Sequence, residues 1–283
     1  RGDDATCELT YLCLAARRAT QLVYPTVGLA WHEGTPPELT GFACRMLRTG
    51  VGDPAFFNDE LIASGLRDHG VSEADSYNYM NSTCVEIKSV GNANIWVASP
   101  YYNCAQLLLD AIDLVVDGEA AADDFGAFED LLRCRIDAMV REGAERLDAV
   151  WERRAETGGF PLGSCFIDDC LARGVDFDRG GARYHWVENS FVGLANLVDG
   201  LTAIEHLVYE ARELSLDELR QILRRDFEGA EALRQRILNR LPSYGNADET
   251  ADARAAKWAA ALMEITGANT IGSHAYVPGF FCW

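Results

Sequence analysis

The chain has 283 residues, of which 48% are hydrophobic and 24% are charged. This balance is typical of a globular protein and excludes a fibrous or disordered chain. Forty-four acidic residues against 25 basic residues give a formal net charge of -19, which would repel the phosphates of a nucleic acid. No uninterrupted apolar run approaches the length of a membrane span. Neither a nucleic acid nor a membrane is therefore expected as a partner.

The sequence contains nine cysteines, an odd number, and no Cys-x-x-Cys pair. Neither a disulfide framework nor a zinc knuckle is expected from this pattern, and most of the cysteines are interpreted as small buried hydrophobes of a reduced, cytoplasmic protein. The segment that starts at Asp176 begins like a calcium loop, but its twelfth position is Val187, where a bidentate carboxylate is needed. No bound metal or cofactor is expected.

The sequence pattern of the first third of the chain changes near residue 52, from helical spacing to short apolar stretches. Residues 10–50 have apolar side chains at helical spacing around a turn at 34–37, where two prolines forbid a continuous helix. This pattern predicts helix, loop, helix. Residues 52–103 contain short apolar stretches between Gly, Asn, Ser and Pro, with strands expected at 85–87 and 95–97. Loop-rich stretches of this kind often carry chemistry.

The remainder of the chain has a helical pattern. Residues 128–151 predict a long amphipathic helix, with apolar positions on one face and charges on the other. Ser215 and Glu218 have the Ser-x-x-Glu form of a capping box, and the helix that begins there is expected to end at Pro242. An alanine-rich helix is expected from about residue 249 to residue 267.

Cys84 and Glu86 are the candidate catalytic pair. In an extended segment the side chains alternate, so residues spaced by two project to the same side and would face one pocket. A thiol and a carboxylate would then share a substrate. The spacing alone also fits a chance pair on a half-buried strand, so the surrounding sequence decides between the two interpretations.

Four further segments, in the right order around this pair, resemble the glycyl radical enzyme family of pyruvate formate-lyase. They are similar to the family's Gly-x-Pro-x-x-x-Asn-Asp-Glu segment, its Gly-Gly-Ala-Arg-Tyr turn, its Asp-x-Leu-x-Ala-Ile-x-x-Leu-Val helix and its Pro-Lys-Tyr-Gly-Asn-Asp-Asp segment. The matching residues of this chain are 52–60, 180–184, 199–208 and 242–248. Each segment is a weak signal alone, whereas five in order, with the Cys-Val-Glu of 84–86, are specific.

The resemblance implies an α/β fold, a barrel of ten strands wrapped in helices, with a cysteine loop at its centre. By this resemblance Cys84 is the thiyl residue, because it alone occupies the Cys-Val-Glu position, and Glu86 is the base beside it. The radical is stored on a glycine, and a partner activating enzyme installs it with S-adenosylmethionine and an iron-sulfur cluster. The full-length protein is expected to be a homodimer that acts on a small polar metabolite.

The family's glycine loop, Arg-Val-x-Gly-Tyr, does not occur in these 283 residues. The chain is therefore interpreted as an internal part of the barrel, helix-rich and incomplete at both ends. It would form a single partial domain over 1–283 without the glycyl radical domain, and it would not turn over substrate alone.

The residues near the cysteine favour one subclass of the family. Formate acetyltransferases carry two adjacent cysteines, but Thr83 precedes Cys84, so elimination by a dehydratase or lyase is favoured, with cleavage of a C–O, C–N, C–S or C–C bond. Ala98 stands where the dehydratase acting on glycerol has an acidic residue, which disfavours glycerol. Tyr101 and Tyr102 fall where family members present pocket-lining side chains, with aromatic core packing an equal alternative. Acyl transfer from pyruvate and a non-catalytic split or degenerate relative are the alternative functions.

Overall fold

The computed structural model describes residues 4–22, 24–81, 86–96, 100–271 and 275–281. The chain divides into two compact units. The first unit comprises Arg1–Asn94 and Phe160–Tyr184, and the second comprises Ile95–Gly159 and His185–Trp283. The single partial domain expected over 1–283 stays a prediction. None of the helices described is long and apolar enough to cross a membrane.

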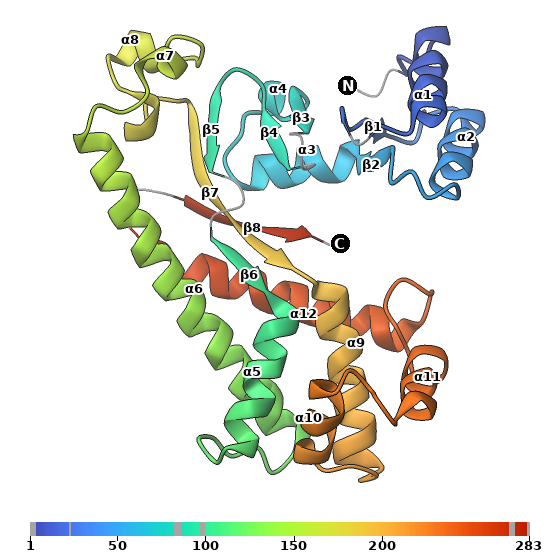
Figure 1. Cartoon of the computed structure of the whole chain (residues 1–283). Helices are drawn as coiled ribbons and strands as arrows, with labels where there is room; N and C mark the ends of the chain where they lie inside the picture. The colour runs from blue at the N-terminus through green and yellow to red at the C-terminus, as the bar shows by residue number, and fades with distance from the viewer. Residues whose placement is uncertain (1–3, 23, 82–85, 97–99, 272–274, 282–283) are drawn as a thin grey trace. The chain divides into compact units, whose positions relative to one another are not determined.

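The first unit combines short strands with short helices (Figure 1). Its elements are α1 (Glu8–Thr20), β1 (Gly28–Trp31), α2 (Pro37–Leu47), β2 (Ala55–Asn58), α3 (Asp59–Asp68), α4 (Glu73–Ser76), β3 (Tyr79–Asn81), β4 (Ile87–Ser89), α7 (Pro161–Ser164), α8 (Cys170–Arg173) and the 3-10 turn η1 (Phe177–Arg179). β1 and β2 pair in parallel, whereas β3 and β4 form an antiparallel pair. The predicted helix, loop, helix pattern is confirmed by α1 and α2, and β1 lies in the loop between them.

The second unit is built around strand β7 (Tyr184–Val192), which starts at the last residue of the first unit. The other elements are β6 (Tyr101–Asn103), α5 (Cys104–Val116), α6 (Phe125–Glu156), α9 (Leu194–Ile204), the π-helical turn η2 (Glu205–Glu210), α10 (Leu216–Arg224), α11 (Glu231–Arg240), α12 (Glu249–Ala268) and β8 (Ala275–Phe281). β6 and β8 pair with β7 in parallel. β5 (Ala93–Trp96) also belongs to this sheet, in the order β5-β7-β6.

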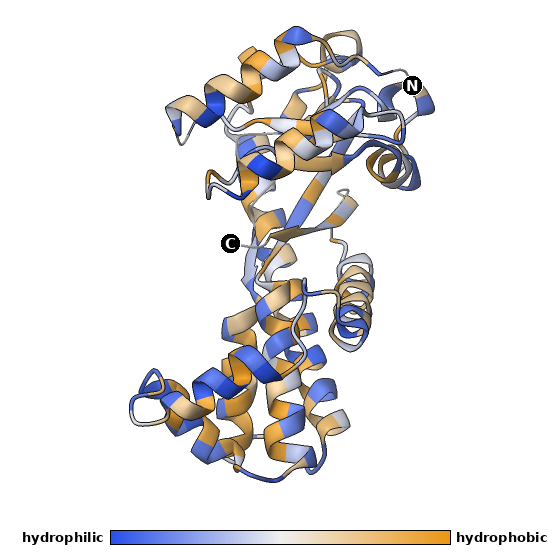
Figure 2. Cartoon of the chain, turned by 90° about the vertical axis from the view of Figure 1, so that its right-hand side faces the viewer, coloured by the Kyte–Doolittle hydropathy of each residue, from blue (hydrophilic) through white to orange (hydrophobic). Residues whose placement is uncertain are grey.

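Helices cover one face of the β6-β7-β8 sheet. Val187 of β7 is fully buried against Trp151 and other apolar residues of α6. Phe191 of β7 stacks on Tyr102 of β6, and both join the apolar core formed with α5, α6, α9 and α12. Figure 2 shows hydrophobic and hydrophilic residues interspersed along the helices. Because side chains alternate along a strand, the even-numbered residues of β7 point to the opposite face of the sheet.

Tyrosine hydroxyls attach the sheet to α6. The hydroxyl of Tyr102 donates to the carbonyl of Val140 at 3.3 Å, and that of Tyr276 in β8 donates to the carbonyl of Ala144 at 3.4 Å. Burial raises the pKa of Tyr276 to about 12 and also raises the pKa of Tyr102. Because of these raised pKa values, both hydroxyls stay protonated and act as donors at neutral pH. The close approach of Tyr102 needs a small residue on α6, and that residue is Gly143.

The long helix and the alanine-rich helix are confirmed as α6 and α12. The capping box is also confirmed, because the Ser215 hydroxyl accepts from the Glu218 amide while the Glu218 carboxylate accepts from the Ser215 amide. The prediction that this helix continues to Pro242 is wrong. α10 ends at Arg224, and Asp226 and Phe227 adopt left-handed backbone with φ of 50° and 60°, which ends the helix before α11 begins.

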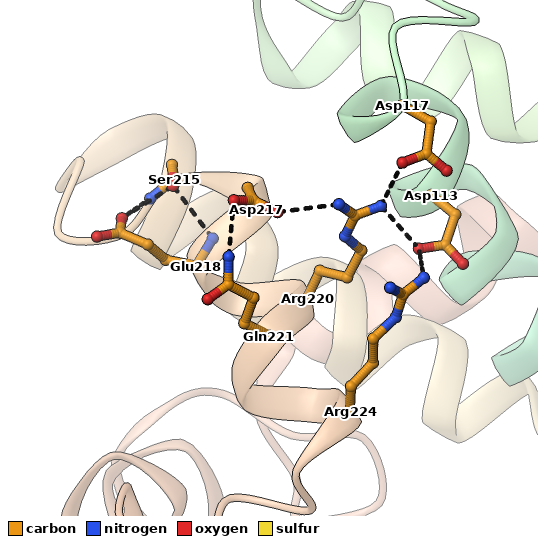
Figure 3. Close-up of polar contacts among 8 residues, drawn as sticks. All are labelled: Asp113, Asp117, Ser215, Asp217, Glu218, Arg220, Gln221 and Arg224. Atoms are coloured by element: carbon orange, nitrogen blue, oxygen red, sulfur yellow. Dashed lines mark hydrogen bonds and ion pairs between the residues drawn. The ribbon is translucent and has the colours of Figure 1, made fainter.

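Arg220 of α10 joins that helix to α5 through charged groups (Figure 3). Its guanidinium donates to Asp117 at 2.6 Å and to Asp217 of its own helix at 3.0 Å. Arg224 donates to Asp113 of α5 at 2.9 Å. The Arg220 side chain is only 16% exposed, so these contacts orient α10 more firmly than separate surface ion pairs would.

The π-helical turn η2 directly continues α9 and is also held by charge. The Glu205 carboxylate, at the start of η2, pairs with Arg254 of α12. The guanidinium of Arg254 lies over the ring of Phe125 at 5.3 Å from its centroid. A cation over an aromatic face and an ion pair both favour one orientation of the arginine, so α9, α12 and the start of α6 are linked at this point.

Gly143→Ala is expected to destabilise the protein by about 1–3 kcal/mol, the typical cost of overpacking a core. An added Cβ would overlap the Tyr102 hydroxyl and Pro100. Gly267→Ala in α12 is the matched control, because no atom lies within 4 Å of its added Cβ, and helix propensity should raise stability by roughly 0.5–1 kcal/mol. Chemical denaturation measures both changes; equal stability of the two variants would contradict the packing described.

Candidate active site

Glu86 is a buried acidic residue directly before strand β4. The residue directly precedes Ile87, the first residue of β4, and is 5% exposed. β4 pairs with β3 so that Asn81 lies opposite Ile87 and Tyr79 opposite Ser89. The expected strand at 85–87 therefore begins at Ile87 in the part of the chain that the structure describes.

Cys84 lies between β3 and β4 in the sequence, outside the described residues, as do Thr83 and Val85. The common face of Cys84 and Glu86 stays a prediction for that reason. Of the expected strand at 95–97, β5 contains the first two residues, and Val97 also lies outside the described part.

Contacts on both sides hold the β3-β4 pair in place. The Asn81 side chain lies close to Gly28 of β1. A Cβ added at Gly28 would overlap the side chains of Asn81 and Phe57. The Val90 amide, just after β4, donates to the carbonyl of Asn78 at 2.9 Å. Burial, with the Asp59 carboxylate nearby, raises the pKa of Tyr79. Glu86 is thus carried on a pair of strands packed against β1.

The segment after β4 is bound to more distant parts of the first unit. The Gly91 carbonyl accepts a hydrogen bond from the Asp168 amide at 2.8 Å, and the Asn92 carbonyl accepts one from the Tyr184 amide at 3.1 Å. The Asn94 side chain, which is buried, donates to the carbonyl of Phe177 at 3.0 Å. Groups 77 to 92 residues apart in the sequence are therefore joined beside the candidate site.

The Gly-Gly-Ala-Arg-Tyr turn is held by a charged network. The Arg183 guanidinium forms a bidentate pair with Asp169, with N–O distances of 3.1 and 3.0 Å. The Tyr184 hydroxyl donates to Asp75 at 2.7 Å and accepts from the Ser72 amide at 3.0 Å. Gly181 is needed because a Cβ there would overlap the Val175 carbonyl. These contacts give the motif a structural role, joining the turn to α4 and α8.

The network shifts the acidity of its carboxyl groups. The hydrogen bond from Tyr184 lowers the pKa of Asp75, and the hydrogen bonds from Arg183 lower the pKa of Asp169. Both shifts stabilise the ionised carboxylate in the folded protein. The network is therefore strongest at pH values above the ordinary pKa of an aspartate, where Asp75 and Asp169 are both ionised.

Asp176, in the sequence that begins like a calcium loop, binds backbone groups. Its carboxylate accepts from the amides of Phe160 and Asp178 and from the Ser164 hydroxyl at distances between 2.8 and 3.1 Å. Burial would raise its pKa, but these hydrogen bonds outweigh burial and lower it. Within the described ranges, no three His, Cys, Asp or Glu side chains are arranged to hold a metal.

Tyr101 and Tyr102 point to opposite faces of the sheet. Tyr102 is 2% exposed and packs in the helix-covered core, the packing alternative that the sequence left open. Tyr101 is 52% exposed and meets the ring of Phe281 edge-on at 6.5 Å between centroids. The structure therefore does not bring the two tyrosines together. A pocket-lining role of Tyr101 stays a prediction.

Polar residues of β7 were missed because the strand itself was not predicted from the sequence. Glu188, Asn189 and Ser190 are each at most 8% exposed. Their polar side chains resemble a loop in sequence, although the flanking Trp186-Val187 and Phe191-Val192 are typical of a strand. The β-branched and aromatic residues on both sides were the available signal.

Comparison with known proteins places the chain in a family. A sequence model described as pyruvate formate lyase-like matches residues 1–281. The chain belongs to the pyruvate formate lyase-like family. This result confirms the family resemblance found in the sequence.

The relatives are considerably longer than this chain. It is 30% identical over 287 residues to trans-4-hydroxy-L-proline dehydratase of Clostridioides difficile, covering 95% of this chain and 36% of that protein. It is 27% identical to (2S)-3-sulfopropanediol dehydratase of Klebsiella oxytoca, covering 89% of this chain and 32% of that protein. The chain thus spans about a third of the length of these curated relatives.

Solved structures of two dehydratases share the fold. The hydroxyproline dehydratase from Clostridioides difficile, with substrate bound, matches with a TM-score of 0.82, 26% identity, and coverage of 99% of this chain and 37% of that one. The B12-independent glycerol dehydratase from Clostridium butyricum matches with a TM-score of 0.80, 25% identity, and coverage of 98% and 37%. The predicted fold class is confirmed: the chain forms part of an α/β barrel of the glycyl radical enzyme type.

Tyr184→Phe is expected to destabilise the protein by about 1–2 kcal/mol at pH 7, because Asp75 and the Ser72 amide each lose a partner. A lowered carboxylate pKa gives stability that is present above the unfolded pKa, near 4, and is lost as the pH falls through the folded value. Wild-type stability should therefore fall between about pH 5 and 2, and less steeply in Tyr184→Phe.

Urea denaturation across this pH range measures the effect. Tyr244→Phe is the matched control, because Tyr244 is 43% exposed and contacts Asp199 through its backbone amide. Parallel pH curves for wild type and Tyr184→Phe would show that the hydroxyl does not set the acidity of Asp75.

Proposed function

We propose that this chain forms the cysteine-carrying part of a glycyl radical lyase or dehydratase. In this proposal Cys84 takes a hydrogen atom from a small polar substrate, and Glu86 accepts a proton. The observation that carries the proposal is a carboxylate, 5% exposed, two residues after a cysteine in a chain of this family. Burying a charged side chain is energetically costly, so buried carboxylates are found mainly where they are paired or functional.

The proposed reaction is a redox-neutral elimination. The Cys84 thiyl removes a hydrogen atom from the carbon that bears the substrate hydroxyl, leaving a thiol and a carbon radical. Glu86 accepts the hydroxyl proton, and the electron density released forms the carbonyl as the neighbouring bond breaks. The leaving group departs with the electron pair of that bond, and the remaining radical takes a hydrogen atom back from the Cys84 thiol. The thiyl is thereby regenerated.

The burial of Glu86 suits this chemistry. A base excluded from bulk water acts on the proton placed before it rather than on solvent, and a carbon radical is protected from side reactions. The strand pair that carries Glu86 is packed against β1 and fixed by backbone hydrogen bonds at Val90 and Gly91. A base held on such a support needs little reorganisation during the reaction.

The names of the relatives support elimination over acyl transfer. They include dehydratases of hydroxyproline and sulfopropanediol and isethionate sulfite-lyases. Thr83 in place of a second cysteine points the same way. Cleavage of a C–O, C–N, C–S or C–C bond in a small polar metabolite therefore remains the proposal, and acyl transfer the alternative.

The proposal extends to partners and location. The radical would be supplied by a glycine outside these 283 residues, after activation by an S-adenosylmethionine-dependent enzyme. The complete protein would act as a homodimer in the cytoplasm. Tyr101, half exposed on the sheet face opposite the helices, is proposed to line the substrate pocket.

Glu86→Gln in the full-length, activated enzyme is expected to lower product formation by roughly a hundredfold to ten-thousandfold, the usual effect of a lost general base. Deuterium exchange into the substrate should survive, because Cys84 still exchanges hydrogen with it. Cys84→Ser should abolish both, since an alcohol does not relay hydrogen atoms as a thiol does. Mass spectrometry of product and recovered substrate measures the two quantities, with the glycyl signal confirmed by electron paramagnetic resonance.

Cys165→Ser is the matched control for the thiol, because Cys165 is an exposed free cysteine. Its turnover should equal that of wild type. Near-normal turnover in Glu86→Gln would defeat the elimination mechanism and favour acyl transfer or a base elsewhere in the full-length protein.

A further inference from the structure

Strand β1 begins with a glycine that its backbone conformation does not require. Gly28 is the first residue of β1, and its φ lies outside the left-handed region that favours glycine. Glycine weakens a strand, because it has no side chain to pack and loses much conformational freedom on folding. In a strand it often marks a place where another part of the molecule approaches closely. Gly28 is therefore explained by the space around it.

Asn81 of β3 occupies that space. A Cβ added at Gly28 would lie 2.6 Å from Oδ1 and 3.2 Å from Cγ of Asn81, and 2.8 Å from Cε2 of Phe57 in β2. Non-bonded carbon atoms in contact normally lie about 3.5–4.0 Å apart, so at least one of these groups would have to move. A side chain at position 28 thus displaces Asn81, the ring of Phe57 or β1 itself.

Strand β1 is held from two directions. Leu29, the residue after Gly28, belongs to the apolar cluster formed with α1 and α2. On the other side β1 pairs with β2 over its whole length, and the Ala55 amide donates to the Val27 carbonyl at 2.9 Å. Closely packed elements transmit strain to their neighbours instead of absorbing it. An overlap at Gly28 would therefore be relieved by the side chains that face it, of which Asn81 lies nearest.

Asn81 lies at the end of the β3-β4 pair that carries the candidate base. It pairs with Ile87, and Glu86 directly precedes Ile87 in the sequence. The opposite end of the strand pair is closed by the Val90 amide, which donates to the Asn78 carbonyl at 2.9 Å. Because that end is fixed, a displacement of Asn81 moves the end next to Glu86. The contact with β1 therefore determines where this end lies.

We propose that Gly28 is a positioning residue for the base of the elimination. By leaving room for Asn81, it holds Glu86 where the carboxylate reaches the substrate hydroxyl. This inference rests on the proposed function, in which Glu86 is the base. Gly28 does not touch the substrate and acts only through Asn81. A general base must lie within hydrogen-bond reach of its proton, and a misplacement of about 1 Å can cost roughly a hundredfold in rate.

Gly28→Ala in the full-length, activated enzyme tests the proposal. Product formation should fall by roughly 10- to 100-fold, whereas deuterium exchange into the substrate, which does not need the base, should change by less than about threefold. The ratio of exchange to product formation should therefore rise. A variant that merely contains less folded enzyme lowers both quantities by the same factor and leaves the ratio unchanged. Mass spectrometry of product and recovered substrate measures the ratio.

Gly65→Ala is the matched control. It makes the same substitution in α3 of the first unit, where no atom lies within 4 Å of the added Cβ, and should leave both quantities at their wild-type values. The double variant Gly28→Ala/Asn81→Ala tests the contact itself. Removing the Asn81 amide removes the closest overlap, so Gly28→Ala should change the ratio less in this background than in the wild type, since residues in contact are not additive.

Asn81→Ala alone keeps the test decisive if Gly28→Ala does not fold. It removes the contact with β1 without creating an overlap, and it should also raise the ratio. Circular dichroism and the glycyl signal in electron paramagnetic resonance show that each variant is folded and activated.

Two results would overturn the proposal. One is an unchanged ratio in folded Gly28→Ala or in Asn81→Ala, and the other is an equal effect of Gly28→Ala in the wild type and in the Asn81→Ala background. Failure of the proposed function gives a different result, because Glu86→Gln would then form product at a near-normal rate. A raised ratio in Glu86→Gln with an unchanged ratio in Gly28→Ala would reject this inference alone.

Discussion

Strand β7 presents successive side chains to opposite faces, and the organisation of the second unit depends on that alternation. Val187 packs against α6, whereas Glu188 points away from the helices. The parallel strands β6 and β8 repeat the division, so that Tyr102 and Tyr276 face α6 while Tyr101 faces away. One face of this four-stranded sheet thus packs into an apolar core with the helices, and the alternate side chains of its strands lie on the other face.

In the sequence segments that identify the family, most of the described polar residues hold the fold together. In the first of them Asp53 pairs with Arg17 at 2.5 Å, both side chains being at most 8% exposed, and the Asn58 side chain accepts from the Leu61 amide to cap α3. Asp199, in the third, accepts from the Tyr244 amide of the fourth at 2.8 Å, and burial raises its pKa. The Cys-Val-Glu segment differs from these because its buried carboxylate has a proposed role in chemistry.

Much of the helical structure could be predicted because it has local causes. The capping box at Ser215 and the apolar stripe of α6 are visible within a few residues of sequence. The end of α10 was missed because nothing between 224 and 231 is a proline, although the left-handed backbone at Asp226 and Phe227 breaks the helix.

Strand β7 was missed for a different reason. Six consecutive residues of it are buried, so both faces are covered and no apolar-polar alternation marks the strand. Without the strand, the phase of β6 could not be assigned, and a shift of one residue exchanges the faces of Tyr101 and Tyr102. The candidate pair Cys84 and Glu86 was found from sequence because the Cys-Val-Glu motif is continuous, whereas Tyr101 and Ser190 lie side by side only through pairing of distant strands.

The π-helical turn η2 has a consequence for the rest of the chain. A π turn holds one more residue than the α turn it replaces, and one residue is about 100° of rotation in an α-helix. The residues of η2 are therefore out of phase with the regular continuation of α9. Removing a single residue from Glu205–Glu210 would restore a regular helix and rotate the chain that leads to α10.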